Sequence, residues 1–134
     1  MRTAILLMVI AAFAPQAAAA RGGIKALDSI PDAYWGTWAP GICKDGDKQA
    51  IVLSAKAYAG PLGTCDVASV SEAPSPKGTI YSARLQCADP AQAQKKTPAN
   101  LIIRPGDANQ ISVGPGFDSL RAYQRCPEST RAPK

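Results

Sequence analysis

The catalytic and metal-binding residues available to this chain do not include histidine, because none of its 134 residues is a histidine. Histidine is the side chain that titrates unaided near neutral pH, so Ser-His and Cys-His nucleophiles and histidine-ligated metal sites are excluded. Four cysteines remain, Cys43, Cys65, Cys87 and Cys126. No two of them form a C-x-x-C pair, which argues against a zinc site and a thioredoxin-like redox centre. Their expected role is to form disulfide bonds.

Carboxylates and serine–lysine pairs give little support for catalysis. Ser54 with Lys56 and Ser75 with Lys77 are conceivable nucleophile pairs, but nothing indicates a buried lysine or an oxyanion pocket. Residues 44–48 place two carboxylates around a glycine, yet they lack the further acidic ligands of a calcium loop and predict a solvated turn. We therefore expect a protein that is not an enzyme and that holds no metal and no cofactor. The acidic residues considered for acid–base roles all fall at predicted strand ends or in loops: Asp45, Asp47, Asp66, Glu72, Asp89, Asp107 and Asp118.

Basic side chains outnumber acidic ones, 15 against 10, which gives a formal net charge of +5. They are scattered along the chain, apart from the pair Lys95-Lys96. A nucleic-acid surface would interleave them with exposed aromatic residues, and only Tyr81, Tyr123 and Phe117 come near that pattern. We expect no nucleic acid as partner, and we interpret the charge as contact with, or tolerance of, an anionic cell envelope.

Residues 1–20 have the pattern of a secretory signal peptide. Arg2 precedes an apolar run about half as long as a bilayer span, and small residues predict cleavage before Arg21. The mature chain is expected to have no membrane span and to be periplasmic or secreted, in a compartment where thiols oxidise. An even number of cysteines there predicts two disulfides.

The rest of the chain is predicted to be all-β. No segment after residue 20 keeps a helical apolar period over ten residues, and short β-branched or alternating runs are separated by Gly, Pro, Asn and Asp. We expect an N-terminal arm at 21–33, a small antiparallel up-and-down barrel or coiled sheet at 34–127, and a C-terminal tail at 128–134. About seven strands are predicted, at 34–40, 50–58, 64–72, 78–88, 99–104, 110–114 and 120–126.

The register of the predicted hairpins suggests one disulfide. If Val67 faces Leu85, Cys65 lies directly opposite Cys87, close enough for a bond. The same register pairs Ser69 with Ala83 and Ser71 with Tyr81. The next hairpin is predicted to turn at residues 105–109 and to place aliphatic side chains on one face, with Ile103 opposite Ile111 and Leu101 opposite Val113.

The second disulfide follows from the number of strands. In an up-and-down meander of about seven strands the first and last run the same way, so Cys43 and Cys126 emerge at one end and are expected to pair. Sequence spacing does not decide connectivity. The competing pairing, Cys43 with Cys65 and Cys87 with Cys126, therefore stays open.

Aromatic residues at the start of the first predicted strand are the best candidates for a contact surface. Alternation places Tyr34, Gly36 and Trp38 on one face and Trp35 on the other. Gly36 and Trp38 are predicted to be structural, the glycine allowing a core indole to pack across the closed end of a barrel. Trp35 would then lie near the outer surface, where a large aromatic side chain suits a protein contact. The alternative is that Trp35 caps a barrel end or is covered by the arm.

The stretch Gly36-Thr37-Trp38-Ala39, preceded by Ile30-Pro31 and followed by Cys43, together with Arg125-Cys126-Pro127, resembles a group of small exported bacterial proteins without assigned activity. Some members of that group keep only the cysteine after the tryptophan and the terminal cysteine. The resemblance therefore favours the pairing of Cys43 with Cys126.

The G-x-W opening is also similar to that of the lipocalins and of the small periplasmic inhibitors of bacterial secreted metalloproteases. A lipocalin is longer and adds a helix. The inhibitors share the spacing of Cys43 and Cys65 but join those two positions by their one disulfide, whereas this chain has four cysteines. In the inhibitors an N-terminal arm enters the protease cleft, and the matching segment here is 21–32. This resemblance implies Arg21, Ile24 and Lys25, beside Trp35, as partner-binding residues.

These observations favour a monomeric, non-catalytic exported binding protein, and the first hypothesis is an inhibitor-type module that contacts an envelope or secreted hydrolase. The protein partner is not identified by the sequence. One alternative is a carrier of a small apolar ligand, similar to a reduced lipocalin. Another is an envelope protein with a structural or stress role. The carrier's apolar interior would be formed by Leu53, Val67, Leu85, Leu101, Ile103 and Ile111.

Overall fold

The computed structural model describes residues 23–76, 78–92 and 94–127. The predicted signal peptide, Arg21 and the predicted tail at 128–134 lie outside the described residues. No helical segment in the described ranges has the length and apolar character that a bilayer span requires.

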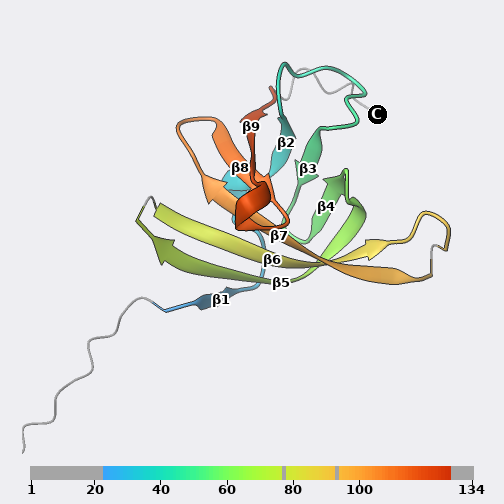
Figure 1. Cartoon of the computed structure of the whole chain (residues 1–134), viewed down its shortest axis with the longest axis horizontal. Helices are drawn as coiled ribbons and strands as arrows, with labels where there is room; N and C mark the ends of the chain where they lie inside the picture. The colour runs from blue at the N-terminus through green and yellow to red at the C-terminus, as the bar shows by residue number, and fades with distance from the viewer. Residues whose placement is uncertain (1–22, 77, 93, 128–134) are drawn as a thin grey trace, which may run out of the picture.

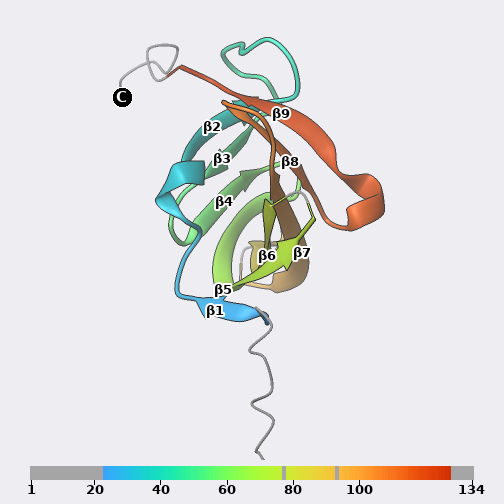
Figure 2. The ribbon, with the colours of Figure 1, turned by 90° about the vertical axis from the view of Figure 1, so that its left-hand side faces the viewer.

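The described chain is all-β, as predicted, with nine strands in one sheet and two short 3-10 turns, η1 (Asp32–Tyr34) and η2 (Phe117–Ser119). Strands β2 to β9 follow one another as an antiparallel meander, and the ring closes because the last strand, β9, pairs with the first, β2 (Figures 1 and 2). The strands are β1 (Lys25–Leu27), β2 (Gly36–Ala39), β3 (Ile51–Leu53), β4 (Ala57–Gly60), β5 (Gly63–Ser75), β6 (Gly78–Ala88), β7 (Lys96–Pro105), β8 (Gln110–Gly114) and β9 (Arg121–Arg125).

Strand β1 lies within the predicted arm and was not expected. It pairs only with the far half of β5, from Lys25 opposite Glu72 to Leu27 opposite Val70, outside the closed ring (Figure 1). The chain then crosses one end of the barrel. Ile30 is fully buried there, and its backbone N–H donates to the carbonyl of Ala55 at 2.9 Å.

Alternating side chains of the barrel strands fill its interior. Period-two alternation sends one face of each strand inward, and most of the inward side chains are aliphatic or aromatic. Burial of this cluster is the main force that holds the barrel together. The buried cluster consists of Ile30, Trp38, Ile51, Leu53, Tyr58, Cys65, Val67, Val70, Ala83, Leu85, Cys87, Leu101, Ile103, Ile111, Val113 and Tyr123.

The single strand predicted at 50–58 is wrong, because a turn divides it into β3 and β4. The backbone N–H of Ser54 donates to the carbonyl of Ala57 at 3.0 Å and closes that turn. The core positions change from odd to even numbers across it, since Leu53 and Tyr58 are both buried. One continuous strand would have directed Tyr58 out of the core.

The predicted β5–β6 register is confirmed only at its first pairs, Cys65 with Cys87 and Val67 with Leu85. A β-bulge between Val67 and Ser69 then shifts the pairing by one residue. The predicted pairs Ser69–Ala83 and Ser71–Tyr81 are therefore wrong. The extra residue turns Val70 into the core in place of a serine, which is the physical advantage of the bulge.

The β7–β8 register is also shifted from the prediction, by two residues. Ile103 pairs with Val113, and Pro105 pairs with Ile111. The turn is shorter than expected and is closed by the N–H of Gly106 donating to the carbonyl of Gln110 at 3.1 Å. A two-residue shift preserves which face each side chain occupies, so the aliphatic residues remain inside.

Both expected disulfides are present, Cys65–Cys87 and Cys43–Cys126, and the competing pairing is wrong. The reasoning for Cys43–Cys126 was nevertheless incorrect, because the ring has eight strands and its first and last strands, β2 and β9, are antiparallel neighbours. Cys43 reaches Cys126 because the loop after β2 folds back over that strand. Ala39, which follows Trp38 in β2 and points to the opposite face, is also fully buried.

Candidate functional site

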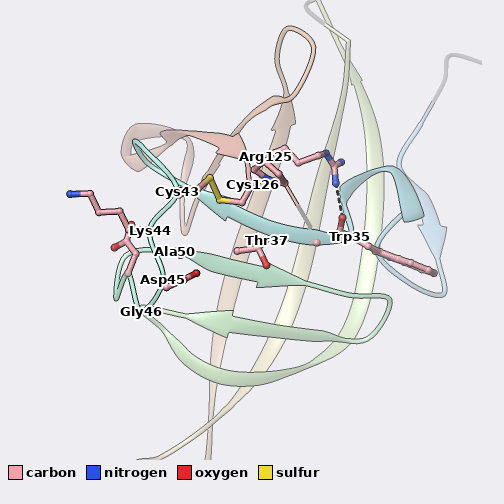
Figure 3. Close-up of a pocket in the computed structure, with 13 residues that line it drawn as sticks. Trp35, Thr37, Cys43, Lys44, Asp45, Gly46, Ala50, Arg125 and Cys126 are labelled. Atoms are coloured by element: carbon pink, nitrogen blue, oxygen red, sulfur yellow. Dashed lines mark hydrogen bonds between the residues drawn. A yellow bond between two sulfur atoms is a disulfide. The ribbon is translucent and has the colours of Figure 1, made fainter. Parts of the chain in front are cut away.

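A hollow of about 470 Å³ lies on the outside of the barrel, over β2 (Figure 3). Small side chains of Thr37, Ala39 and Ala50 line it from the barrel wall, and residues 43–47 line it from the folded-back loop. The remaining lining residues are Trp35, Gly36, Arg125, Cys126 and Pro127. The Cys43–Cys126 disulfide thus joins the loop to the end of β9 at the hollow itself (Figure 3).

The loop that covers β2 is shaped by its own turns. The N–H of Asp47 donates to the carbonyl of Lys44 at 3.3 Å, and the N–H of Ala50 donates to the carbonyl of Asp47 at 3.2 Å. Asp47 Oδ1 accepts a bond of 2.9 Å from the N–H of Gln49, as aspartate often does in turns. Asp47 therefore stabilises the turn. In the described ranges, no group of three or more His, Cys, Asp or Glu side chains is placed to hold a metal ion.

Arg125 joins the last strand to the segment before the first barrel strand. It pairs with Trp38 across β9 and β2, and its guanidinium carbon lies 4.3 Å from the centre of the Trp38 ring. Its Nη1 donates to the carbonyl of Trp35 at 2.8 Å, and its Nη2 donates to the carbonyl of Ala33. These contacts close that end of the barrel with a charged group that sequence reasoning did not assign. The motif Arg125-Cys126-Pro127 was its one visible signal.

Trp38 is buried and Trp35 is exposed, as predicted, but the predicted strand at 34–40 begins too early, because Tyr34 ends the 3-10 turn η1 and Trp35 precedes β2. Trp38 is 2% exposed and belongs to the core, and its Nε1 donates to the carbonyl of Tyr34 at 2.9 Å. Trp35 is 42% exposed and lines the hollow, and its Nε1 donates to the carbonyl of Ile30 at 2.7 Å. The Trp35 indole is thus held at its polar edge while much of the ring meets solvent.

Gly36 occupies the place between these indoles for two reasons. Its φ of +126° is a backbone conformation that side chains with a Cβ rarely adopt. A Cβ at this position would also lie 3.3 Å from Arg125 Nη1. The predicted structural role of Gly36 therefore depends on its conformation and on the arginine above Trp38.

Of the other predicted partner-binding residues, Ile24 and Lys25 do not line this hollow, and Arg21 lies outside the described residues. Ile24 is 78% exposed, and Lys25 begins β1, where its Nζ lies 3.9 Å from Glu72 Oε1. Lys25 and Glu72 line a separate hollow of about 260 Å³ along β5. The segment from Lys25 to Leu27 is thus already paired with the sheet, and its proposed contact with a partner stays a prediction.

Two tyrosines have perturbed acidity, and neither lines the hollow over β2. Burial, and to a lesser extent the neighbouring Tyr81, whose ring centre lies 5.2 Å away, together raise the pKa of Tyr34 to about 12. Burial also raises the pKa of Tyr58. Both side chains stay protonated at neutral pH, so they cannot act there as general bases.

The arrangement can bind by shape and by polar contact. It offers an exposed indole, a shallow floor of small side chains, and both signs of charge from Lys44, Asp45, Asp47 and Arg125. Comparison with known proteins found no matching protein family, no matching curated protein and no matching solved structure.

Proposed function

We propose that this protein is an exported, non-catalytic binding protein that contacts another protein through Trp35 and the hollow over β2. The observation that carries the proposal is that the partly exposed Trp35 side chain lies at the edge of a hollow that is also lined by the Cys43–Cys126 disulfide. Exposed tryptophan beside a preformed depression is typical of the residues that dominate protein interfaces. Two disulfides are compatible with an oxidising compartment outside the cytoplasm.

An inhibitor-type contact with an envelope or secreted hydrolase remains the form of binding that we favour. Its support is the resemblance of the G-x-W opening and the position of the N-terminal segment. Because Lys25–Leu27 pairs with β5, such a contact would use this segment as an edge strand, or would first displace it. As part of this proposal, the protein is a monomer and acts in the periplasm or outside the cell.

The test is capture of a partner from envelope extract by the wild-type protein and by Trp35→Ala, at two salt concentrations. We expect Trp35→Ala to weaken capture at least about ten-fold, because interface tryptophans often contribute 2 kcal/mol or more to binding. Val52→Ala is the matched control, since Val52 is 37% exposed on the outer face of β3 and does not line the hollow. Equal capture by all three proteins would remove Trp35 from the contact surface.

The role of the arm needs its own variant. Deleting residues 21–24 removes Ile24 while sparing β1 and the buried Ile30. An inhibitor-type contact predicts loss of hydrolase inhibition with unchanged thermal stability. Full inhibition after this deletion would exclude residues 21–24 from the contact.

A further inference from the structure

The two disulfides of this protein differ in their access to solvent. Cys65 and Cys87 are 1% and 5% exposed, and both belong to the buried interior cluster. Cys126 is also buried, at 8% exposed, but Cys43 is only half-buried, and the bond between them lines the hollow over β2 on the outside of the barrel (Figure 3). A thiolate must approach a disulfide sulfur directly to exchange with it. Access therefore favours attack at Cys43.

Among the described residues, the loop that Cys43 anchors has few hydrogen bonds to the barrel. Residues 44–47 line the hollow over β2 on one side and a second hollow, of about 580 Å³, on the other. Besides its internal turns, a hydrogen bond of 3.3 Å from Arg121 Nη1 to Gln49 Oε1 holds this loop to β9. Ile42, at its start, is 81% exposed. The disulfide is thus the main constraint that keeps the loop over β2.

The barrel has independent means of staying closed when this bond is broken. Strands β2 and β9 remain paired at Trp38 with Arg125, and the N–H of Cys126 donates to the carbonyl of Thr37 at 2.8 Å. The Cys65–Cys87 bond and the buried interior are untouched by opening the loop. Reduction would remove some stability by releasing chain entropy, without removing the core.

We propose that Cys43–Cys126 is a reducible disulfide that holds the loop beside the hollow, whereas Cys65–Cys87 is a permanent structural bond. A thiolate of an exported dithiol attacks Cys43 Sγ, forms a mixed disulfide, and releases Cys126 as a thiolate that takes a proton from water. The second thiol of the reductant then attacks the mixed disulfide and frees Cys43. The reductant leaves as a disulfide, and the protein gains two thiols.

The consequence of this exchange is the opening of the hollow. The loop at residues 43–47 leaves one side of it, and the outer face of Ala39 becomes exposed. The charge around the hollow does not explain why Cys43–Cys126 would be reduced before Cys65–Cys87, because the lining holds two cations and two carboxylates: Lys44, Arg125, Asp45 and Asp47. The claim that opening the hollow abolishes partner binding rests on the proposed function. The claim that Cys43–Cys126 is reduced selectively does not.

The experiment is graded reduction of the folded, oxidised protein with dithiothreitol, followed by N-ethylmaleimide and peptide mapping. We expect Cys43 and Cys126 to be labelled at least about ten-fold faster than Cys65 and Cys87, since exchange rates follow access. Far-UV circular dichroism should keep its strand signal, while amide hydrogen exchange should accelerate at residues 43–50. Equal labelling, earlier labelling of Cys65, or loss of the strand signal together with Cys43 labelling would overturn the proposal.

A second arm separates this proposal from the proposed function. The selectively reduced, alkylated protein is compared with the oxidised protein in the capture assay. Loss of partner capture by the reduced protein supports the proposal that the Cys43–Cys126 bond controls binding. Unchanged capture overturns that part of the proposal. Failure of Trp35→Ala to weaken capture by the oxidised protein would reject the proposed site while leaving the labelling result intact.

Discussion

At the scale of single residues, the closed end of the barrel depends on a stack of Arg125 over Trp38. Their positions are paired across two strands that are far apart in sequence. The arginine contributes a cation over the indole face and two hydrogen bonds to carbonyls of the preceding segment. The G-x-W motif is thus explained by packing, and Trp38 should not be counted among the partner-binding residues.

Gly36→Ala tests this packing. We expect it to lower the free energy of unfolding by about 1–3 kcal/mol, because alanine would be forced into a positive-φ conformation and against Arg125 Nη1. Gly41→Ala is the matched control, since a Cβ at Gly41 meets no atom within 4 Å. Urea unfolding followed by tryptophan fluorescence measures both variants. Equal stability of the two would show that Gly36 is not under this constraint.

At the scale of elements, the bulge in β5 decides which residues enter the core. It places Val70 inside at 3% exposed and leaves Ser69 exposed. A regular hairpin carried on from Cys65 and Val67 would have placed Ser69 and Ser71 inside instead. The sequence contains a signal for the bulge, the aliphatic Val70 at an even position. Strict alternation counted from Cys65 assigns that position to the outer face, so the signal is missed.

Val70→Ala and Ser69→Ala form a matched pair for this register. We expect Val70→Ala to cost about 2 kcal/mol of stability, because it removes buried methyl groups and leaves a cavity. Ser69→Ala should change stability by less than about 0.5 kcal/mol, as is usual at the surface. Thermal or urea unfolding distinguishes them. The opposite order of effects would restore the unbulged register.

At the scale of the whole molecule, the contents of the barrel bear on the carrier alternative. Eight-stranded barrels are just wide enough to be filled by side chains or to hold one small ligand. Here the residues expected to line a ligand cavity are all buried, at most 7% exposed, and they pack in one cluster. The filled interior favours binding at the outer surface.

An apolar fluorescent probe tests this choice. The wild-type protein should not bind the probe, whereas Leu85→Ala should bind it weakly and lose about 2–5 kcal/mol of stability, because the substitution opens a cavity in the core. Leu62→Ala, at a position 37% exposed, is the control that should behave as wild type. Saturable binding of the probe to the wild-type protein, lost in a filled-core variant such as Ala83→Leu, would instead support the carrier.

The all-β meander, the position of Cys65 opposite Cys87 and the burial of Trp38 could be predicted from the sequence alone. These features depend on local alternation and on pairing between consecutive strands, which a short stretch of residues specifies. The tertiary structure was needed to show the closure of the ring, the antiparallel contact of β2 with β9, the stacking of Arg125 on Trp38 and the Cys43–Cys126 bond that holds the loop after β2. Each of these joins residues distant in the chain, and their contact is selected by packing of the whole interior, which no local pattern encodes.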